Sequence, residues 1–288
     1  MGLPREFALI ARHFRPLAGD GALDLSDDAA LLTPPAGQQL VLAADALVEG
    51  VHFLPDDPPG MIARKLLRVN LSDLAAMGAA PLGYLMTTAF TRGTSDSWIA
   101  DFVAGLAEDQ QRYGITVLGG DTVATPGPAC FSLTIIGTVP PGQALHRRGA
   151  RIGDEVWVSG SIGDGALGLR VLQGKLAADA EGHLARRYRL PEPRLALGQA
   201  PAFRGQAQLV DKLTELLGRI GGPAFGRGRI TGKACPQQHQ AAGLCAVGAR
   251  DRDLVVGQDV LGQPLGAARG VGLVHRLAAL QERAVGAL

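Results

Sequence analysis

The chain has 288 residues, of which 47% are hydrophobic, and its formal net charge is +1. This length and composition predict a globular protein of one large or two ordinary domains and exclude a disordered chain. The near-zero charge provides no field for nucleic acid or acidic membranes, no apolar run reaches membrane-spanning length, and the first twelve residues lack the apolar region of a signal peptide.

Helix-like and strand-like patterns alternate along the first 175 residues. Apolar residues at helical spacing predict helices over residues 6–14, 60–78, 95–113 and 165–173, the third capped by Ser95 and closed by Gly114. Apolar or alternating runs predict strands over residues 40–44, 82–90, 115–118, 130–139 and 155–159. This order indicates an α/β or α+β fold with mixed sheets covered by helices.

A Gly-, Pro- and Arg-rich stretch over residues 140–154 predicts a domain junction. We therefore expect an N-terminal domain over residues 1–145 and a C-terminal domain over residues 146–288. Patterns weaken after Pro191, where residues 209–220 and 274–288 are the remaining helix candidates. Only Phe203 and Phe225 of the 13 aromatic residues follow residue 196, so this stretch has little material for a core.

The three cysteines, Cys130, Cys235 and Cys245, are odd in number and far apart. They predict a reducing compartment without a disulfide framework, and hence a cytoplasmic protein.

Aspartates adjoin several of the apolar segments and mostly lack an adjacent basic partner. Asp27 and Asp28 precede an apolar run, Asp45 ends the strand expected over residues 40–44, Asp73 lies in the helix over residues 60–78, and Asp121 follows Gly119 and Gly120. Unpaired buried carboxylates are costly, so the set favours a shared cation, and hard oxygen ligands suit Mg²⁺. For any single position, capping or turn formation remains an equally good interpretation.

Other candidates are weaker by themselves. Gly119-Gly120 and Gly163-Asp164-Gly165 would let backbone N–H groups approach an anion, although a tight turn explains them as well. His52 lies near Asp45 and is either a packed side chain or a site residue. Arg147 and Arg148 would pair with nucleotide phosphates or lie in a solvated loop.

Together these residues resemble the thiamine-monophosphate kinase family. Residues 47–53 read L-V-E-G-V-H-F, residues 69–79 read V-N-L-S-D-L-A-A-M-G-A, and residues 119–122 read G-G-D-T, each matching a family pattern in full. The acidic pair stands in Ser26-Asp27-Asp28-Ala29-Ala30, where the family has G-D-D-A-A. The resemblance covers about residues 5–200.

The resemblance implies a two-domain fold shared with aminoimidazole ribonucleotide synthetase, a homodimer formed by the N-terminal domains, and ATP bound near the subunit interface. It implies Mg²⁺- and ATP-dependent phosphorylation of thiamine monophosphate to thiamine diphosphate by direct in-line transfer, with no covalent nucleophile. It assigns Mg²⁺ to Asp28, Asp45, Asp73 and Asp121, with Asp27 a further ligand. It assigns nucleotide binding to Gly120, Asp121 and Arg147, and it places His52 at the substrate side of the site.

The sequence departs from the family beyond about residue 200. The family patterns I-D-x-S-D-G-L and G-G-[DE]-D-Y-E-L, which supply further metal ligands and substrate contacts, do not occur in residues 200–288. Ser26 and Ala44 also replace a family Gly and Thr. The alternative hypothesis is therefore an inactive homolog, with its last third diverged or read out of frame, that retains nucleotide and Mg²⁺ binding or dimerisation.

Overall fold

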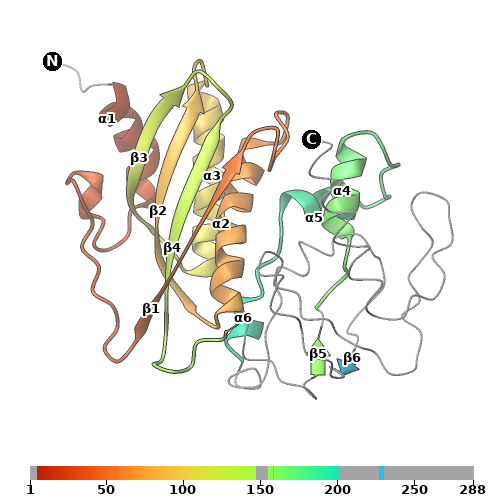
Figure 1. The fold of residues 1–288 in the computed structure, drawn as a ribbon. Coiled ribbons are helices and arrows are strands. Elements are labelled where there is room, and N and C mark those ends of the chain that lie inside the picture. The colour runs from red at the N-terminus through yellow and green to blue at the C-terminus, as the bar shows by residue number, and fades with distance from the viewer. Residues whose placement is uncertain (1–4, 147–154, 158, 201–226, 230–288) are drawn as a thin grey trace, which may run out of the picture.

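The structure is a computed structural model that describes residues 5–146, 155–157, 159–200 and 227–229 (Figure 1). Its helices are α1 (Arg5–Leu9), α2 (Pro59–Ala76), α3 (Asp96–Tyr113), α4 (Asp164–Leu172), α5 (His183–Arg189) and α6 (Leu195–Gly198). Its strands are β1 (Gln39–Val48), β2 (Ala80–Thr91), β3 (Val117–Thr125), β4 (Cys130–Val139), β5 (Glu155–Trp157) and β6 (Arg227–Arg229). None of the helices in these residues is long and apolar enough to cross a membrane.

The first four strands form one mixed sheet in the order β1-β4-β2-β3. β4 is antiparallel to both of its neighbours, whereas β2 and β3 run parallel and are joined through α3. The short strands β5 and β6 pair separately, antiparallel to each other. The predicted mixed sheet with covering helices is thus confirmed for this part of the chain.

Helices α2 and α3 lie side by side over one face of the four-stranded sheet (Figure 1). Leu66, Leu71, Phe102 and Leu106 of these helices are fully buried, in the same core as Phe131 and Leu133 of β4. The helices approach so closely that a Cβ on Gly105 would lie 2.2 Å from the carbonyl oxygen of Gly60. Any larger residue at Gly105 would therefore separate the two helices.

The opposite face of the sheet is not covered by any element of the described residues. It exposes apolar side chains from three strands: Leu40 and Leu42 of β1, Leu85 of β2, and Val123 of β3. Leu42 is 63% exposed, which is unusual for a leucine in the middle of a strand.

The N-terminal helix expected over residues 6–14 is not regular. α1 ends at Leu9, a π-helical turn follows over Ile10–Phe14, and a 3-10 turn over Arg15–Leu17 completes the segment. The wide turn carries both His13 and Phe14 into the protein, where His13 Nε2 lies 2.7 Å from Asp96 Oδ1. Tertiary contacts at these two adjacent residues therefore override the regular helical spacing.

Two strands are longer than the sequence predicts, and this moves two of the predicted site residues. β1 continues past residue 44 to Val48, and β3 continues past residue 118 to Thr125. Each extension keeps its hydrogen-bonded pairing, β1 with β4 and β3 with β2. Asp45 and the segment Gly119-Gly120-Asp121 consequently lie inside strands and not at strand ends or in a tight turn.

Beyond residue 155 the described residues include α4, α5 and α6. α6 packs against the end of α2, and Gln199 Nε2 donates to the carbonyl of Ala79 at 3.1 Å. α4 matches the helix predicted over residues 165–173 closely. The helices expected over residues 209–220 and 274–288 lie outside the described residues, and the boundary expected at residue 145 stays a prediction.

Candidate functional site

Asp27 and Asp28 are exposed and follow a 3-10 turn with unusual backbone geometry. The three residues of that turn, Leu23–Leu25, all have positive φ, between 52° and 56°. None of them is glycine, so each costs of order 1 kcal/mol. The strained turn and Ser26 together precede the acidic pair.

Asp45 lies inside β1, on the side of the sheet that faces α2. Along β1 the odd-numbered residues are the more buried ones, and Leu47 is 4% exposed. The backbone N–H of Asp45 donates to Oδ1 of Asn70 at 3.1 Å, and Nδ2 of Asn70 donates to the carbonyl of Leu66 at 2.9 Å. Asn70 is fully buried, so its amide fixes α2 against β1 at the position of Asp45.

Asp73 lies on α2 one turn after Asn70. Residues three apart on a helix share a face, so Asp73 projects from the same side of α2 as the amide that binds Asp45. Asp73 is half-buried. The structure thus joins Asp45 to Asn70, and Asp73 lies one turn further along α2. Asn70 is a residue that the sequence analysis did not assign to the site.

Gly120 and Asp121 lie on β3, at the other edge of the sheet. Gly120 has φ of 154°, and a Cβ there would lie 1.7 Å from the carbonyl oxygen of Met86, so only glycine fits. Asp121 is exposed beside Thr87 on the uncovered face, and its Oδ1 accepts the backbone N–H of Thr122 at 2.8 Å.

Asp45 and Asp121 are kept apart within one chain. β1 and β3 are the two edge strands, with β4 and β2 between them, which corresponds to about 14 Å across the sheet. The register puts Asp45 in the row of Leu133, on the helix-covered face, and Asp121 in the row of Thr87, on the other. Within the described ranges, no group of three or more His, Cys, Asp or Glu side chains is arranged to hold a metal ion. Shared Mg²⁺ binding by the four acids therefore stays a prediction.

His52 lies in the loop between β1 and α2, and its imidazole is exposed. Its Nδ1 accepts the backbone N–H of Val48 at 3.0 Å. A neutral imidazole whose Nδ1 is an acceptor carries its proton on Nε2. His52 therefore presents an N–H donor to solvent. Arg147, the predicted nucleotide contact, lies outside the described residues.

Buried charged side chains connect α2, α3 and the residues that follow α5. Arg68 donates two hydrogen bonds to Asp109, from Nε at 2.6 Å and from Nη2 at 2.9 Å, and both side chains are at least 97% buried. Arg68 Nη1 also donates to the carbonyl of Pro191 at 3.2 Å. These bonds keep the pKa of Arg68 above its ordinary value even though burial alone would lower it. The group is structural, because it leaves no open position for a ligand.

The glycine-rich segment 163–165 begins α4. Asp164 is buried there, and its Oδ2 lies 2.9 Å from Nε2 of His183 at the start of α5. This pair joins α4 to α5. The carboxylate is thus occupied by a neighbouring helix, and the segment shows a structural role.

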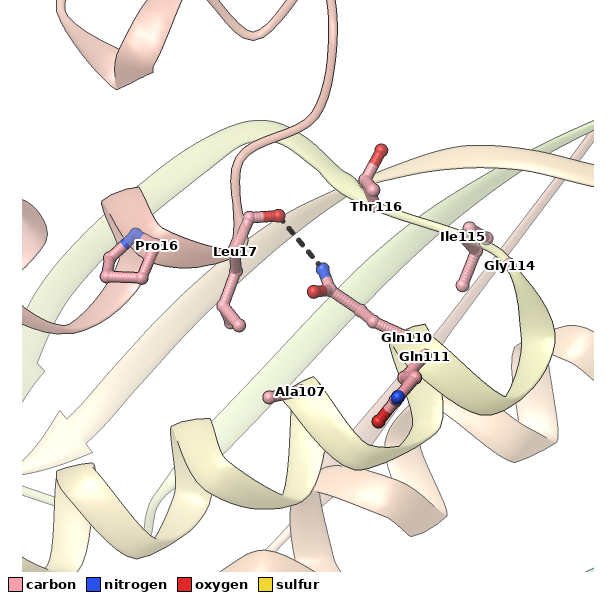
Figure 2. A pocket seen from close by; sticks show the side chains of 8 residues that line it. All are labelled: Pro16, Leu17, Ala107, Gln110, Gln111, Gly114, Ile115 and Thr116. Atoms are coloured by element: carbon pink, nitrogen blue, oxygen red, sulfur yellow. Dashed lines mark hydrogen bonds between the residues drawn. The ribbon is translucent and has the colours of Figure 1, made fainter.

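A shallow pocket of about 390 Å³ lies between the first turns of the chain and the end of α3. Figure 2 shows its eight lining residues, among them Gln110, whose Nε2 donates to the carbonyl of Leu17 at 3.2 Å. The same nitrogen donates to the hydroxyl of Tyr84 at 3.1 Å. None of the predicted site residues lines this pocket, and the only polar group buried in its wall already serves the fold.

Comparison with known protein families matches residues 26–139 to the model described as AIR synthase related protein, N-terminal domain. Among curated proteins, the chain is 49% identical over 206 residues to the thiamine-monophosphate kinase of Caulobacter vibrioides, covering 71% of this chain and 58% of that protein. It is 44% identical over 223 residues to the thiamine-monophosphate kinase of Escherichia coli K12, covering 75% of this chain and 68% of that protein. The chain thus spans somewhat more than half to about two thirds of these relatives.

Solved structures of thiamine-monophosphate kinases also align with this chain. The crystal structure of thiamine-monophosphate kinase from Stenotrophomonas maltophilia K279a aligns with a TM-score of 0.59 at 41% identity, covering 66% of this chain and 61% of that one. A structure of AaThiL complexed with AMPPCP and TMP aligns with a TM-score of 0.56 at 28% identity, covering 63% of this chain and 58% of that one.

Proposed function

Because this chain belongs to the thiamine-monophosphate kinase family, we propose that it transfers the γ-phosphoryl group of ATP to thiamine monophosphate, giving thiamine diphosphate and ADP. The observation that carries the proposal is the 44% identity over 223 residues to the Escherichia coli enzyme. That aligned length is more than the 114 residues of the matched N-terminal domain, residues 26–139, which include His52 and Asp73.

The residues fit a magnesium-dependent phosphoryl transfer. Asp27, Asp28 and Asp121 are exposed carboxylates and Asp45 and Asp73 are half-buried ones, which is the oxygen donor set that Mg²⁺ prefers. Mg²⁺ held by these side chains would neutralise the charge of the nucleotide phosphates. We assign the ions to these five residues.

The chain's own groups would orient the two anionic substrates. Gly120 is exposed on β3, and we assign it, Asp121 and Arg147 to the nucleotide. His52 would donate its Nε2–H to the substrate. Transfer is direct, from the γ-phosphorus of ATP to a phosphate oxygen of thiamine monophosphate, so no side chain needs to act as a nucleophile.

We further propose a homodimer formed through the uncovered face of the sheet. Leu42, Leu85 and Val123 leave this face apolar, and Asp121 lies on it beside Thr87. Asp45 lies on the opposite face of the same sheet, so one chain does not present both acids to one nucleotide. In a two-fold dimer formed through this face the same patch of both copies meets, so the nucleotide assigned to Asp121 would lie at the subunit interface.

The purified chain should convert thiamine monophosphate and ATP to thiamine diphosphate and ADP when Mg²⁺ is added, measured by separating the thiamine phosphates. Unphosphorylated thiamine is the control acceptor, since it lacks the attacking phosphate oxygen. The Asp121→Asn variant should lose turnover by at least about 100-fold because it removes a charge at the phosphates.

The alternative is a homolog that binds Mg²⁺ and ATP without catalysis. The absence of the S-D-G-L and D-Y-E-L patterns from residues 200–288 favours it. Calorimetric binding of Mg²⁺·ATP with no thiamine diphosphate formed would support this alternative and reject the kinase proposal. If neither binding nor turnover occurs, both are rejected.

A further inference from the structure

The helix α5 holds the loop that carries His52. Two side chains donate to the carbonyl oxygen of His52: the ammonium of Lys65 on α2, at 2.6 Å, and the hydroxyl of Tyr188 on α5, at 3.3 Å. The Lys65 ammonium also lies 3.6 Å from the centroid of the Tyr188 ring, within cation–π range. His52, Lys65 and Tyr188 therefore form one connected group, drawn from a loop and two helices.

The same loop is attached to α5 a second time, five residues further on. Arg189 Nε donates to Oδ1 of Asp57 at 2.6 Å, and Oδ2 of Asp57 accepts the backbone N–H of Leu54 at 2.9 Å. The Asp57 side chain is 2% exposed, so this ion pair is well shielded from solvent. Two consecutive residues of α5 thus fix the loop at His52 and at Asp57.

The backbone of His52 determines where its imidazole points. Val48 binds the ring at Nδ1, and the backbone N–H of His52 donates to the carbonyl of Val48 at 2.8 Å. A shift of the loop would change both bonds together and free Nδ1 to take the proton. Hydrogen bonds that hold the carbonyl of His52 in place therefore stabilise the imidazole tautomer that carries the proton on Nε2.

We propose that Lys65 and Tyr188 are positioning residues that hold His52 with its Nε2–H directed to the substrate. Neither side chain needs to touch the substrate itself. The inference rests on the proposed function, in which His52 contacts thiamine monophosphate. It also gives α5, which follows the N-terminal domain in sequence, a part in building the substrate side of the site.

Burial supports the donor role of Tyr188. It raises the pKa of the phenol to about 12, so the hydroxyl keeps its proton at neutral pH.

Tyr113 offers a matched control. Its ring lies near the guanidinium groups of Arg68 and Arg112, at 5.7 and 5.4 Å, but its buried hydroxyl has no hydrogen-bond partner.

The test compares the full chain with its Lys65→Met, Tyr188→Phe and Tyr113→Phe variants. Histidine labelled with ¹⁵N reports the tautomer of His52, which a His52→Gln spectrum assigns, and amide exchange of Val48 reports its bond to the ring. Loss of the charged donor in Lys65→Met should speed Val48 exchange about tenfold or more and shift His52 toward mixed tautomers. Tyr188→Phe should speed exchange about two- to fivefold, because it removes one long neutral hydrogen bond.

Tyr113→Phe should leave both readouts unchanged. In an active chain, Lys65→Met and Tyr188→Phe should raise KM for thiamine monophosphate and leave KM for ATP as it was. An unchanged His52 tautomer and Val48 exchange rate in Lys65→Met would overturn the proposal. An equal rise in KM for thiamine monophosphate and for ATP would overturn it as well. If the unsubstituted chain forms no thiamine diphosphate, the kinase proposal fails, while the tautomer and exchange rates still decide the positioning role.

Discussion

Replacing Asp109 by alanine should be strongly destabilising, because this carboxylate neutralises two arginines in the protein interior. Its side chain is 1% exposed and accepts N–H groups from Arg64 at 3.2 Å and from Arg68 at 2.6 and 2.9 Å. Without it, the Arg68 guanidinium, 3% exposed, keeps Glu192 at 3.4 Å as its one acidic neighbour in the part of the chain that the structure describes. Removing one partner of such a buried pair costs about 3–5 kcal/mol, since the remaining charge stays desolvated.

Urea unfolding followed by tryptophan fluorescence measures this loss directly. Trp98 stacks on Phe102 of the same helix, 5.6 Å between ring centroids, so its emission reports the helical layer that Asp109 stabilises. Arg112→Met is the control, since Arg112 is 51% exposed where it pairs with Glu192, and such a pair is worth about 0–1 kcal/mol.

The joint replacement Arg68→Met with Asp109→Leu should recover most of the stability that Asp109→Ala loses. It removes both charges and fills their space with apolar atoms. A loss below about 1 kcal/mol in Asp109→Ala would refute the reasoning. The reasoning would also be refuted if the joint variant were as unstable as Asp109→Ala, because the lost stability would then come from lost packing and not from an unpaired charge.

Two further predictions concern the sheet edge and the N-terminal turn. Gly120→Ala should lower the free energy of unfolding by about 2 kcal/mol or more, because its Cβ would meet the carbonyl of Met86. Gly119→Ala should be nearly neutral, because the nearest atom to its Cβ is at 3.4 Å. Equal unfolding midpoints for the two variants would contradict this reasoning. The hydrogen bond with His13 holds the pKa of Asp96 below its ordinary value, so its stabilising effect is present at neutral pH and is lost as pH falls below about 4. The melting temperatures of the chain and of Asp96→Asn should therefore converge in acid, and a constant difference across pH 2–7 would show that Asp96 does not act through its charge.

From Gln39 to Val139 the helices and strands follow from local pattern, whereas the strand ends do not. α3 begins at a Ser95 cap and ends at Gly114 in the left-handed region, as its sequence signals require. The continuation of β1 through Asp45 depends on pairing with β4, some 90 residues later, which no local window contains. The side of the sheet that each acid faces is equally a matter of register.

Of the residues that hold the candidate site in place, Asn70 could have been found from the sequence, whereas Lys65 and Tyr188 could not. The acids stood out because charge beside apolar runs is rare. Asn70 stands within an apolar helical run, so a buried amide there was a usable signal. Lys65 and Tyr188 gave no such signal, because both are ordinary residues of amphipathic helices and their partner is a backbone carbonyl of a distant loop.

The central place of β4, the last of the four strands along the chain, has a consequence during biosynthesis. β1 hydrogen-bonds only to β4 among the described strands, and β2 meets β1 only through it. Until the ribosome has released the segment that ends at Val139, the newly made Gln39–Val48 has no native strand partner, and its leucine-rich edge is open to misplaced association. β2 and β3 pair with each other directly, so the insertion of β4 joins β1 to a pair that can form before it, and the ordering of β1 during translation should be late and abrupt.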